Sequence, residues 1–392
     1  MPYAHRPDIH DADTHMMERP DWIAAFADAA VRPHLAPYVG GRAESLAVIE
    51  DALARFARRR SDARLAADDD AAFMSMRHKG WHGLGAFDAA ERAHANDLLG
   101  FKAHIVFPTS AFDQVVAATD SNVLIGGVRA LNRGLASFCA ADARMFGAAY
   151  VPLGTGPEQA RVLLDEVIDA GFRVVLIDTV PPRDGVSFTH PDYDGIWARI
   201  QDANLAVVLH VGANGRWFNP VPSSLYANGR LRPAHVEGDA PRDALAYMSI
   251  HHEAQLFLAA MIFDGVLERF PRLRIGVVEL GASWIVSWMK HLDQAFRAFR
   301  RLQDLSDVKR EPSEYVRRQV KVTPFAGEDI GWLLTSGAED LLMFASDYPH
   351  HEGTDDPIGR FERTMAGIDE VRKAKFYAQN FRAFMQLDRD GA

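Results

Sequence analysis

The sequence predicts an α/β protein, a (β/α)8 TIM barrel with long insertions after strands 1 and 5. Short apolar β-type runs alternate with amphipathic helical stretches along the chain. Most of these runs are nearly continuous in Val, Ile and Phe, as in strands that are buried on both faces. The chain has 392 residues, whereas a bare barrel needs about 250. The surplus leaves room for insertions.

Eight runs are expected as strands, which is the number that closes such a barrel. In chain order they are Ile9–His15, Ala103–Pro108, Ala148–Leu153, Phe172–Asp178, Leu205–Val211, Arg274–Glu279, Val320–Pro324 and Leu342–Asp347. Helical patterns lie between them. Pro157–Ala170 begins with Pro and is followed by Gly171, the usual punctuation of a helix. Further helices are expected at Asp194–Ala203, Glu253–Phe270 and Ser283–Leu302.

Two connections are too long for plain strand-to-helix loops. One covers about 16–102, with helical patterns at Ser45–Arg60 and Asp88–Gly100, and the other covers about 212–252, rich in Asn, Gly and Pro. Both leave from the carboxyl ends of strands, where barrel enzymes keep their active sites. We expect walls or lids over the site, or oligomer contacts, within a single domain spanning 1–392. Plain surface decoration is the alternative.

Composition excludes several partners. With 43 basic and 53 acidic residues, the net charge is −10, and the absence of a basic tract argues against nucleic acid and anionic membranes. No apolar run reaches the roughly 18 residues of a membrane span, and MPYAHRPDIHDADTH lacks the apolar core of a signal peptide. The single cysteine, Cys139, fits a reducing compartment. A cytoplasmic protein is expected.

Polar residues close four of the apolar runs: Asp13 and His15, His210, Glu279, and Asp347. A charged residue at the end of such a run costs free energy unless it is paired or bound to metal. In a barrel these ends converge on one cavity, and His with carboxylate suits Zn²⁺, Mn²⁺ or Fe²⁺. Residues i and i+2 of a strand face the same way, so Asp13 and His15 can point at one ion.

The chain at this point resembles the amidohydrolase superfamily, in the branch that contains aminocarboxymuconate-semialdehyde decarboxylase and its relatives. The matching pieces are DADTHMMERPD, ALNRGLASFCAADARMFGAAYVPL, HPDYDGIWARIQDANLAVVLHVG, GVLERFPRLRIGVVELGASWIVSWMKHLD, FASDYPHHEGTDDP and AKFYAQNFRAFM. Together they span most of the chain outside the two insertions. The set is specific to the branch and not to one reaction.

The resemblance implies one divalent metal ion, Zn²⁺ before Mn²⁺ or Fe²⁺, bound by Asp13, His15, His210 and Asp347. It also implies that Asp347 exchanges a proton with the reacting centre. Glu279 lies where many relatives have a histidine, which leaves its role open between ligand, orienting group and substrate contact. The fourth run, FRVVLID, ends without the lysine that a two-metal site would use, so one ion is expected.

Supporting residues are less constrained. Glu18 follows the first run and is expected either to fix the loop or to face the site. Arg77 and His82, with His78, lie in the first insertion and are candidates for binding an acidic substrate. His251, beside His252, is a catalytic candidate together with Asp347 and Glu279. His350, preferred over His351, is a candidate for substrate binding.

These parts serve two reactions on a small carboxylated compound, possibly of aromatic origin. One is hydrolysis by a metal-activated water, and the other is non-oxidative decarboxylation with an Asp acid–base. An iron-dependent, oxygen-activating hydroxylase on the same barrel is the first alternative. A non-catalytic metal-binding partner subunit is the second. The resembling family implies a homodimer.

Overall fold

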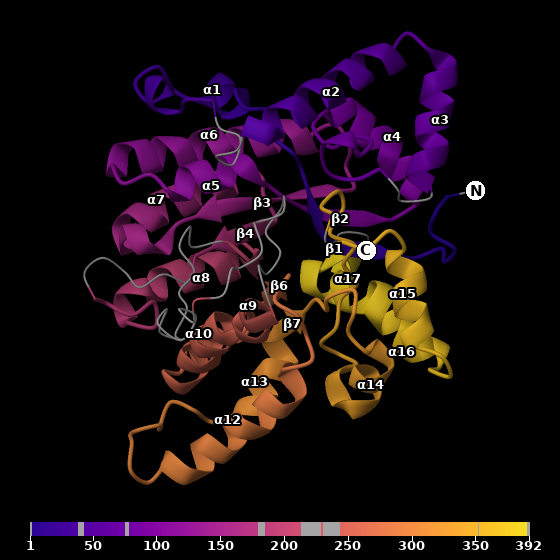
Figure 1. Cartoon of the computed structure of the whole chain (residues 1–392). Helices are drawn as coiled ribbons and strands as arrows, with labels where there is room; N and C mark the ends of the chain where they lie inside the picture. Colours follow the sequence, from indigo (N-terminus) through magenta and orange to yellow (C-terminus); the bar gives the residue numbers. More distant parts are fainter. Residues whose placement is uncertain are drawn as a thin grey trace. The chain divides into compact units, whose positions relative to one another are not determined.

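The protein is described by a computed structural model that covers residues 2–37, 43–74, 78–178, 185–212, 229, 244–351 and 353–389 (Figure 1). The chain forms two compact units. The first contains Met1–Tyr150 and Ala345–Arg360, and the second contains Val151–Phe344 and Phe361–Ala392. Arg77, one of the residues expected to bind substrate, lies outside the described residues.

The first unit is built on three parallel strands, β1 (His10–His15), β2 (Ala103–Phe107) and β3 (Met145–Val151), paired in chain order. Every residue of β1 and β2 is buried. The register of β1 against β2 shifts between Asp11 and Thr14. This irregularity includes the predicted ligand Asp13 and ends just before His15, which is paired with Phe107.

Helices of the first unit come mostly from the predicted insertion after the first strand. They are α1 (Trp22–Phe26), η1 (Arg32–His34), α2 (Ala43–Arg59), α3 (Ala63–Met74), η2 (Gly80–His82), α4 (Ala89–Leu99), α5 (Ser110–Val116) and α6 (Ser121–Cys139). The α4 helix has the expected punctuation, because Asp88 accepts a hydrogen bond from the Glu91 N–H and Gly100 ends it at a φ of 75°. Gly134 of α6 gives room for Trp22 of α1.

The second unit is built on β4 (Val174–Ile177), β5 (Ala206–His210), β6 (Ile275–Val278) and β7 (Val320–Val322), again parallel and paired in chain order. Its helical segments are η3 (Leu153–Thr155), α7 (Pro157–Asp169), η4 (Pro191–Tyr193), α8 (Asp194–Asp202), α9 (Ala244–Ser249), α10 (His252–Phe263), α11 (Val266–Arg269), α12 (Ile285–Phe299), α13 (Pro312–Gln319), α14 (Ile330–Leu333), η6 (Leu334–Ala338), α15 (Pro357–Thr364, which begins in the first unit), α16 (Glu370–Ala374), η7 (Lys375–Gln379), α17 (Asn380–Met385) and η8 (Leu387–Arg389).

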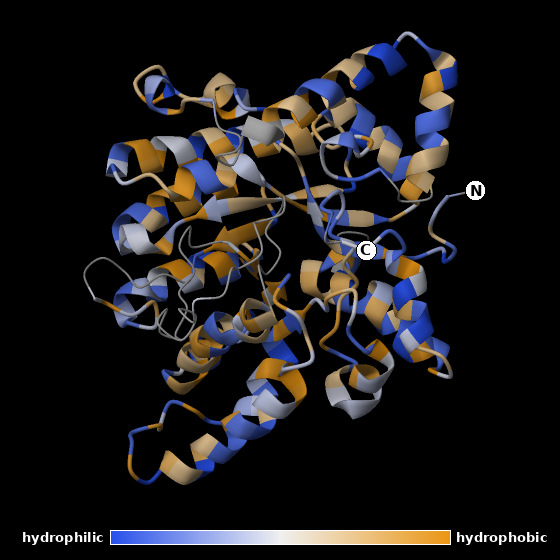
Figure 2. Cartoon of the chain, in the orientation of Figure 1, coloured by the Kyte–Doolittle hydropathy of each residue, from blue (hydrophilic) through white to orange (hydrophobic). Residues whose placement is uncertain are grey.

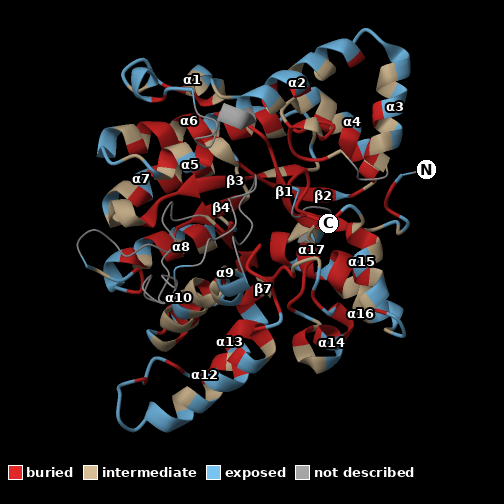
Figure 3. Ribbon diagram, viewed as in Figure 1, coloured by how far each residue is buried: buried red, intermediate tan, exposed pale blue. Residues whose placement is uncertain are grey.

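Hydropathy and burial follow the same logic in both units. Most strand residues are coloured as buried in Figure 3, whereas the helices carry exposed and buried residues side by side. Figure 2 shows the corresponding mixture of hydrophilic and hydrophobic residues along α2, α3 and α12. Among the described residues, no helix combines the length and apolar character that crossing a bilayer requires. The α/β class with parallel strands is therefore confirmed.

Two elements differ from the prediction. The expected helix Glu253–Phe270 is interrupted by Gly265, whose φ of 73° is left-handed, so that α10 and α11 form instead. The eighth run, Leu342–Asp347, makes only isolated parallel bridges, one at Leu342 to Val322 and one at the following Tyr348 to Thr14. Its backbone N–H groups bind unlike partners, including the Phe376 carbonyl and the Asp11 carboxylate, so no regular ladder forms. Closure by an eighth strand stays a prediction.

Candidate metal centre

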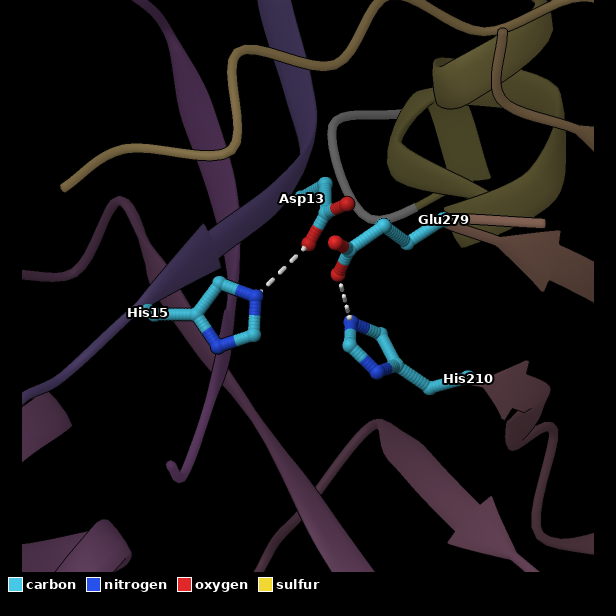
Figure 4. Close-up of side chains that lie close together, drawn as sticks. All are labelled: Asp13, His15, His210 and Glu279. Carbon is cyan, nitrogen blue, oxygen red and sulfur yellow. Dashed lines mark ion pairs between the residues drawn. The ribbon is translucent and has the colours of Figure 1, made fainter. Parts of the chain in front are cut away.

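Strand β1 presents the predicted Asp13 and His15 together. Both side chains are almost fully buried, and the Nε2 atom of His15 lies 3.3 Å from Oδ1 of Asp13 (Figure 4). Their i, i+2 spacing puts them on one face, as the sequence predicts. A buried carboxylate beside an imidazole is a polar pair that needs a cation or a proton for stability.

The segment after Phe344 adds Asp347 and His350 to this pair within the first unit. Oδ1 of Asp347 lies 3.5 Å from Nε2 of His15 and 3.2 Å from Nδ1 of His350. The rings of His15 and His350 stack with their centroids 3.8 Å apart. His350, expected to bind substrate, therefore lies directly against two predicted metal-site residues.

Backbone hydrogen bonds hold this segment against β1. The N–H of Asp347 donates to the carbonyl of Asp13 at 2.9 Å, and the N–H of His15 donates to the carbonyl of Tyr348 at 2.7 Å. Asp347 has a φ of 56°, a conformation that non-glycine residues rarely adopt. Such strain is found where the surrounding structure fixes a functional side chain.

Two buried charged residues support β1, and the sequence analysis assigned a role to neither. The Asp11 carboxylate accepts hydrogen bonds from the N–H groups of Asp13 and Ser346, at 3.1 and 3.0 Å, and burial raises its pKa to about 7. Arg92 is fully buried and donates to the carbonyls of Gly85 and His15. Only the folded contacts identify these roles, because Ser346 is 335 positions from Asp11 along the chain and His15 is 77 positions from Arg92.

Glu18 fixes the loop after β2, which was one of its two expected roles. Its carboxylate accepts hydrogen bonds from the backbone N–H groups of Thr109 and Ala111, at 2.8 and 3.2 Å. Burial is the main cause that raises its pKa to about 7. The hydroxyl of Thr109 donates to the Met16 carbonyl at 2.8 Å and lies 3.1 Å from Nε2 of His350. Thr109 was not predicted from the sequence, where it looks like an ordinary turn residue after a strand.

The second unit holds its own imidazole–carboxylate pair at the predicted strand ends. Nε2 of His210, which ends β5, lies 3.3 Å from Oε2 of Glu279, and both side chains are buried (Figure 4). Nδ1 of His210 lies 2.8 Å from the Val211 carbonyl, which can only accept, so Nδ1 carries the proton. Nε2 is then the nitrogen with a lone pair. Glu279 has a φ of 55°, and its N–H donates to Thr323.

Two other predicted residues have different surroundings. His251 is half-buried, lies parallel to the Trp284 ring with centroids 5.8 Å apart, and has a pKa lowered to about 4 by burial. His82 lies 2.9 Å from the carboxylate of Asp51, and the two side chains are 33% and 67% exposed. His251 is therefore neutral at pH 7, whereas His82 is hydrogen-bonded to Asp51 at the surface.

The donor atoms fit a divalent cation in type and spacing. Tetrahedral or octahedral sites with bonds of about 2.0–2.1 Å place neighbouring ligand atoms about 2.8–3.4 Å apart. The spacings are 3.3, 3.5 and 3.2 Å in the first unit and 3.3 Å in the second. Mixed imidazole and carboxylate donors suit Zn²⁺, Mn²⁺ or Fe²⁺. Such groups of His, Asp and Glu can hold a metal ion.

Comparison with solved structures supports the fold. An amidohydrolase from Mycobacterium avium subsp. paratuberculosis K-10 is 20% identical over 97% of this chain and 100% of its own, with a TM-score of 0.69. A 2,6-dihydroxybenzoate decarboxylase from Rhizobium is 23% identical over 80% of this chain and 91% of its own, with a TM-score of 0.59. A dihydroxybenzoic acid decarboxylase from Polaromonas sp. JS666, with bound manganese and 2-nitroresorcinol, is 18% identical over 98% of both chains, with a TM-score of 0.62.

The family assignment comes from the sequence itself. The family model described as Amidohydrolase matches residues 10–383, which is nearly the whole chain and includes all the strand ends discussed above. The resemblance that the sequence analysis identified is thus confirmed. The chain belongs to the amidohydrolase family and is an enzyme of its metal-dependent hydrolase or carboxy-lyase class.

Proposed function

We propose that this enzyme is a non-oxidative decarboxylase of a small aromatic carboxylate and depends on one divalent cation. The observation that carries the proposal is the buried cluster of Asp13, His15 and Asp347, whose donor atoms are spaced like ligands of one ion. Buried carboxylates and imidazoles at this spacing are costly without a cation. Decarboxylation is preferred to hydrolysis because several solved structures of the same fold are decarboxylases of hydroxylated benzoates.

The proposed ligands are Asp13, His15, His210 and Asp347. Support for His210 comes from its tautomer, since Nδ1 donates to a carbonyl and Nε2 therefore carries the lone pair. Glu279, 3.3 Å from that nitrogen, is proposed as an additional ligand or as the carboxylate that orients His210. Zn²⁺ and Mn²⁺ are the ions to test, manganese because the Polaromonas enzyme contains it.

A bound divalent cation polarises a carboxylate or carbonyl and lowers the pKa of a bound water to about 7. In the proposed reaction the carboxylate of Asp347 has first taken a proton from water and delivers it to the ring carbon that bears the substrate carboxylate. The bond between that carbon and the carboxylate breaks, the proton takes its place, and CO₂ leaves. Water then restores the proton to Asp347, so one proton is consumed in each turnover. No oxidant or reductant takes part.

Substrate contacts are proposed from the same set of residues that the sequence indicates. His251 is neutral at pH 7 and lies against the Trp284 ring, so it is suited to accept or donate a hydrogen bond rather than to pair with a charge. Trp284 offers a flat apolar face of the kind on which aromatic rings stack. Arg77 and His82 remain proposals for the carboxylate end of the substrate.

The test is anaerobic incubation of metal-loaded enzyme with 2,6-dihydroxybenzoate and 5-carboxyvanillate. These are the substrates of decarboxylases that share the fold. CO₂ release and loss of the carboxylated aromatic are measured together. The proposal predicts equal amounts of both, and it predicts that Asp28→Asn, which changes an exposed carboxylate on the surface, leaves the rate unchanged. A chain that consumes these acids only with oxygen would contradict it and favour the iron hydroxylase.

Hydrolysis is the second candidate, because one of the solved structures with the same fold, which covers 97% of this chain, is described as an amidohydrolase. The same metal-activated water would attack an ester, lactone or amide. A panel of lactones and N-acyl aromatic acids, assayed by acid release in weak buffer, separates the two. Acid release without CO₂ would replace decarboxylation by hydrolysis.

A further inference from the structure

The hydroxyl group of Thr109 lies between the two histidines of the first unit. It is 3.1 Å from Nε2 of His350 and 3.4 Å from Nδ1 of His15, and it donates to the carbonyl of Met16 at 2.8 Å. The two imidazole rings stack beside it, with an interplanar angle of 24°. One hydroxyl thus contacts both rings on the side away from the carboxylates of Asp13 and Asp347.

The side chain of Thr109 does not cap the helix that follows it. It is the N-cap residue of α5, where a Thr side chain usually accepts a hydrogen bond from the helix N–H groups, yet its side chain makes no such bond. Glu18 takes the backbone N–H groups of Thr109 and Ala111 instead. The capping carboxylate therefore leaves the Thr109 hydroxyl available for the histidines.

The single proton of the Thr109 hydroxyl determines the tautomers of His15 and His350. A hydroxyl has one proton, and the Met16 carbonyl can only accept, so the proton of Thr109 is used there. The lone pairs of Oγ1 then face the imidazoles, and each contact requires an N–H on the ring. His350 must carry its proton on Nε2, and His15 must carry its proton on Nδ1. A neutral imidazole has a single N–H, so the other nitrogen of each ring has a lone pair.

Those other nitrogens are the ones that face the carboxylates. Nδ1 of His350 is 3.2 Å from Oδ1 of Asp347, and Nε2 of His15 is 3.3 and 3.5 Å from Oδ1 of Asp13 and of Asp347. These spacings exceed the roughly 2.7–2.9 Å of a charge-assisted hydrogen bond. Lone pairs of nitrogen and oxygen that face one another repel unless they share a proton or a metal cation, and these donor atoms belong to groups that can hold a metal ion.

We infer that Thr109 is a positioning residue that fixes the proton of both His15 and His350 on the outer nitrogen, so that both rings present a lone pair to the cation site. His350 thereby becomes a fifth donor to the site rather than a substrate contact. The role assigned to the cation rests on the proposed function, but the tautomers do not. Outer partners of this kind orient metal-binding imidazoles and typically change metal affinity 10–100-fold.

The experiment compares Thr109→Val with Thr109→Ser and with Thr14→Val as the matched control. Valine has nearly the shape of threonine and leaves the backbone N–H that binds Glu18, but it lacks the hydroxyl group. Serine retains the hydroxyl group. Thr14 also donates to a buried carbonyl, that of Ile105. Because Thr14 precedes His15 on strand β1, its side chain points to the opposite face of the strand from the side chain of His15. Apo protein labelled with ¹⁵N-histidine reports the tautomers, with His15→Gln and His350→Gln to assign the signals.

The inference predicts one protonated and one unprotonated nitrogen on each ring in the wild type, mixed tautomers in Thr109→Val, and wild-type signals in Thr109→Ser. Dialysis against buffered Zn²⁺ and Mn²⁺ should show roughly 10–100-fold weaker binding in Thr109→Val alone. Unchanged tautomers and affinity in Thr109→Val, or doubly protonated rings in the wild type, would overturn the inference. If the wild type bound neither metal, the proposed function would fail, while the tautomer signals would still decide the role of Thr109.

Discussion

Replacing Asp347 by Asn removes one carboxylate charge and leaves the shape of the side chain almost unchanged. The backbone contacts of the residue do not involve that group, since its N–H donates to Asp13 and its carbonyl accepts from His350. Asn also tolerates the φ of 56° as well as Asp does. Removing one charge from this buried cluster also relieves a desolvation cost, so we expect the free energy of unfolding of the metal-free protein to fall by no more than about 1 kcal/mol.

Turnover should respond far more strongly. Asp347 is the proposed proton donor, and positioned acid–base groups contribute roughly 10²–10⁴-fold to rates. At about 1.4 kcal/mol for each factor of ten, this is a barrier increase of about 2.7–5.5 kcal/mol. The amide also lacks the charge that faces His15 and His350, so metal binding should weaken as well. The assay must therefore be run with saturating metal.

The measurement is kcat for CO₂ release at rising Zn²⁺ or Mn²⁺, with urea unfolding of the same preparations. Asp28→Asn, at an exposed carboxylate, is the control for handling and charge. Full turnover of Asp347→Asn at saturating metal would refute the assignment of Asp347 as proton donor. A large loss of stability would instead show that the carboxylate holds the fold.

Three further outcomes are expected. Arg92→Met should lower the free energy of unfolding by about 3–5 kcal/mol, because it leaves two buried carbonyls without their charged donor. The control Arg133→Met, at an exposed arginine, should change it by under about 1 kcal/mol in the same urea titration. Equal effects of the two variants would contradict the role of Arg92. Burial raises the pKa of Glu18 from 4.5 to about 7, so between these pH values only the unfolded chain loses the proton, and stability should fall by about 3 kcal/mol as pH rises. Glu18→Gln should lose that part of the slope between pH 5 and 7.5, and an unchanged slope would show that Glu18 does not titrate in this range. The single domain predicted from the sequence requires one cooperative unfolding transition, and two transitions would refute it. The predicted homodimer requires a particle of twice the 43.5 kDa chain mass in light scattering, and a monomer would refute it.

Much of the site was predictable from where polar residues interrupt apolar runs. Asp13 and His15 share a face because strand residues alternate, and a lone histidine after AVVL marked the end of β5. Asp347 was identified for the same reason, although its segment forms no regular strand. The apolar pattern reports burial, but it does not report which backbone groups will pair.

The supporting contacts could not be predicted, because each depends on a partner far along the chain. Arg92 reaches the carbonyl of His15 across 77 positions, and Thr109 contacts His350 across 241. Nothing in the local sequence distinguishes this Thr from an ordinary helix N-cap. His82 is a different case: its place in a Gly- and His-rich insertion predicts substrate binding, which stays a prediction, and its contact with Asp51 at the surface was not predicted.

The account depends most directly on one divalent cation per chain that both imidazole–carboxylate pairs help to bind. Elemental analysis of protein purified without added metal, followed by equilibrium dialysis against Zn²⁺ and Mn²⁺, measures this stoichiometry. We predict one ion per chain, lost in His15→Ala and equally lost in His210→Ala. Two ions per chain, no ion, or full occupancy in either variant would contradict the account.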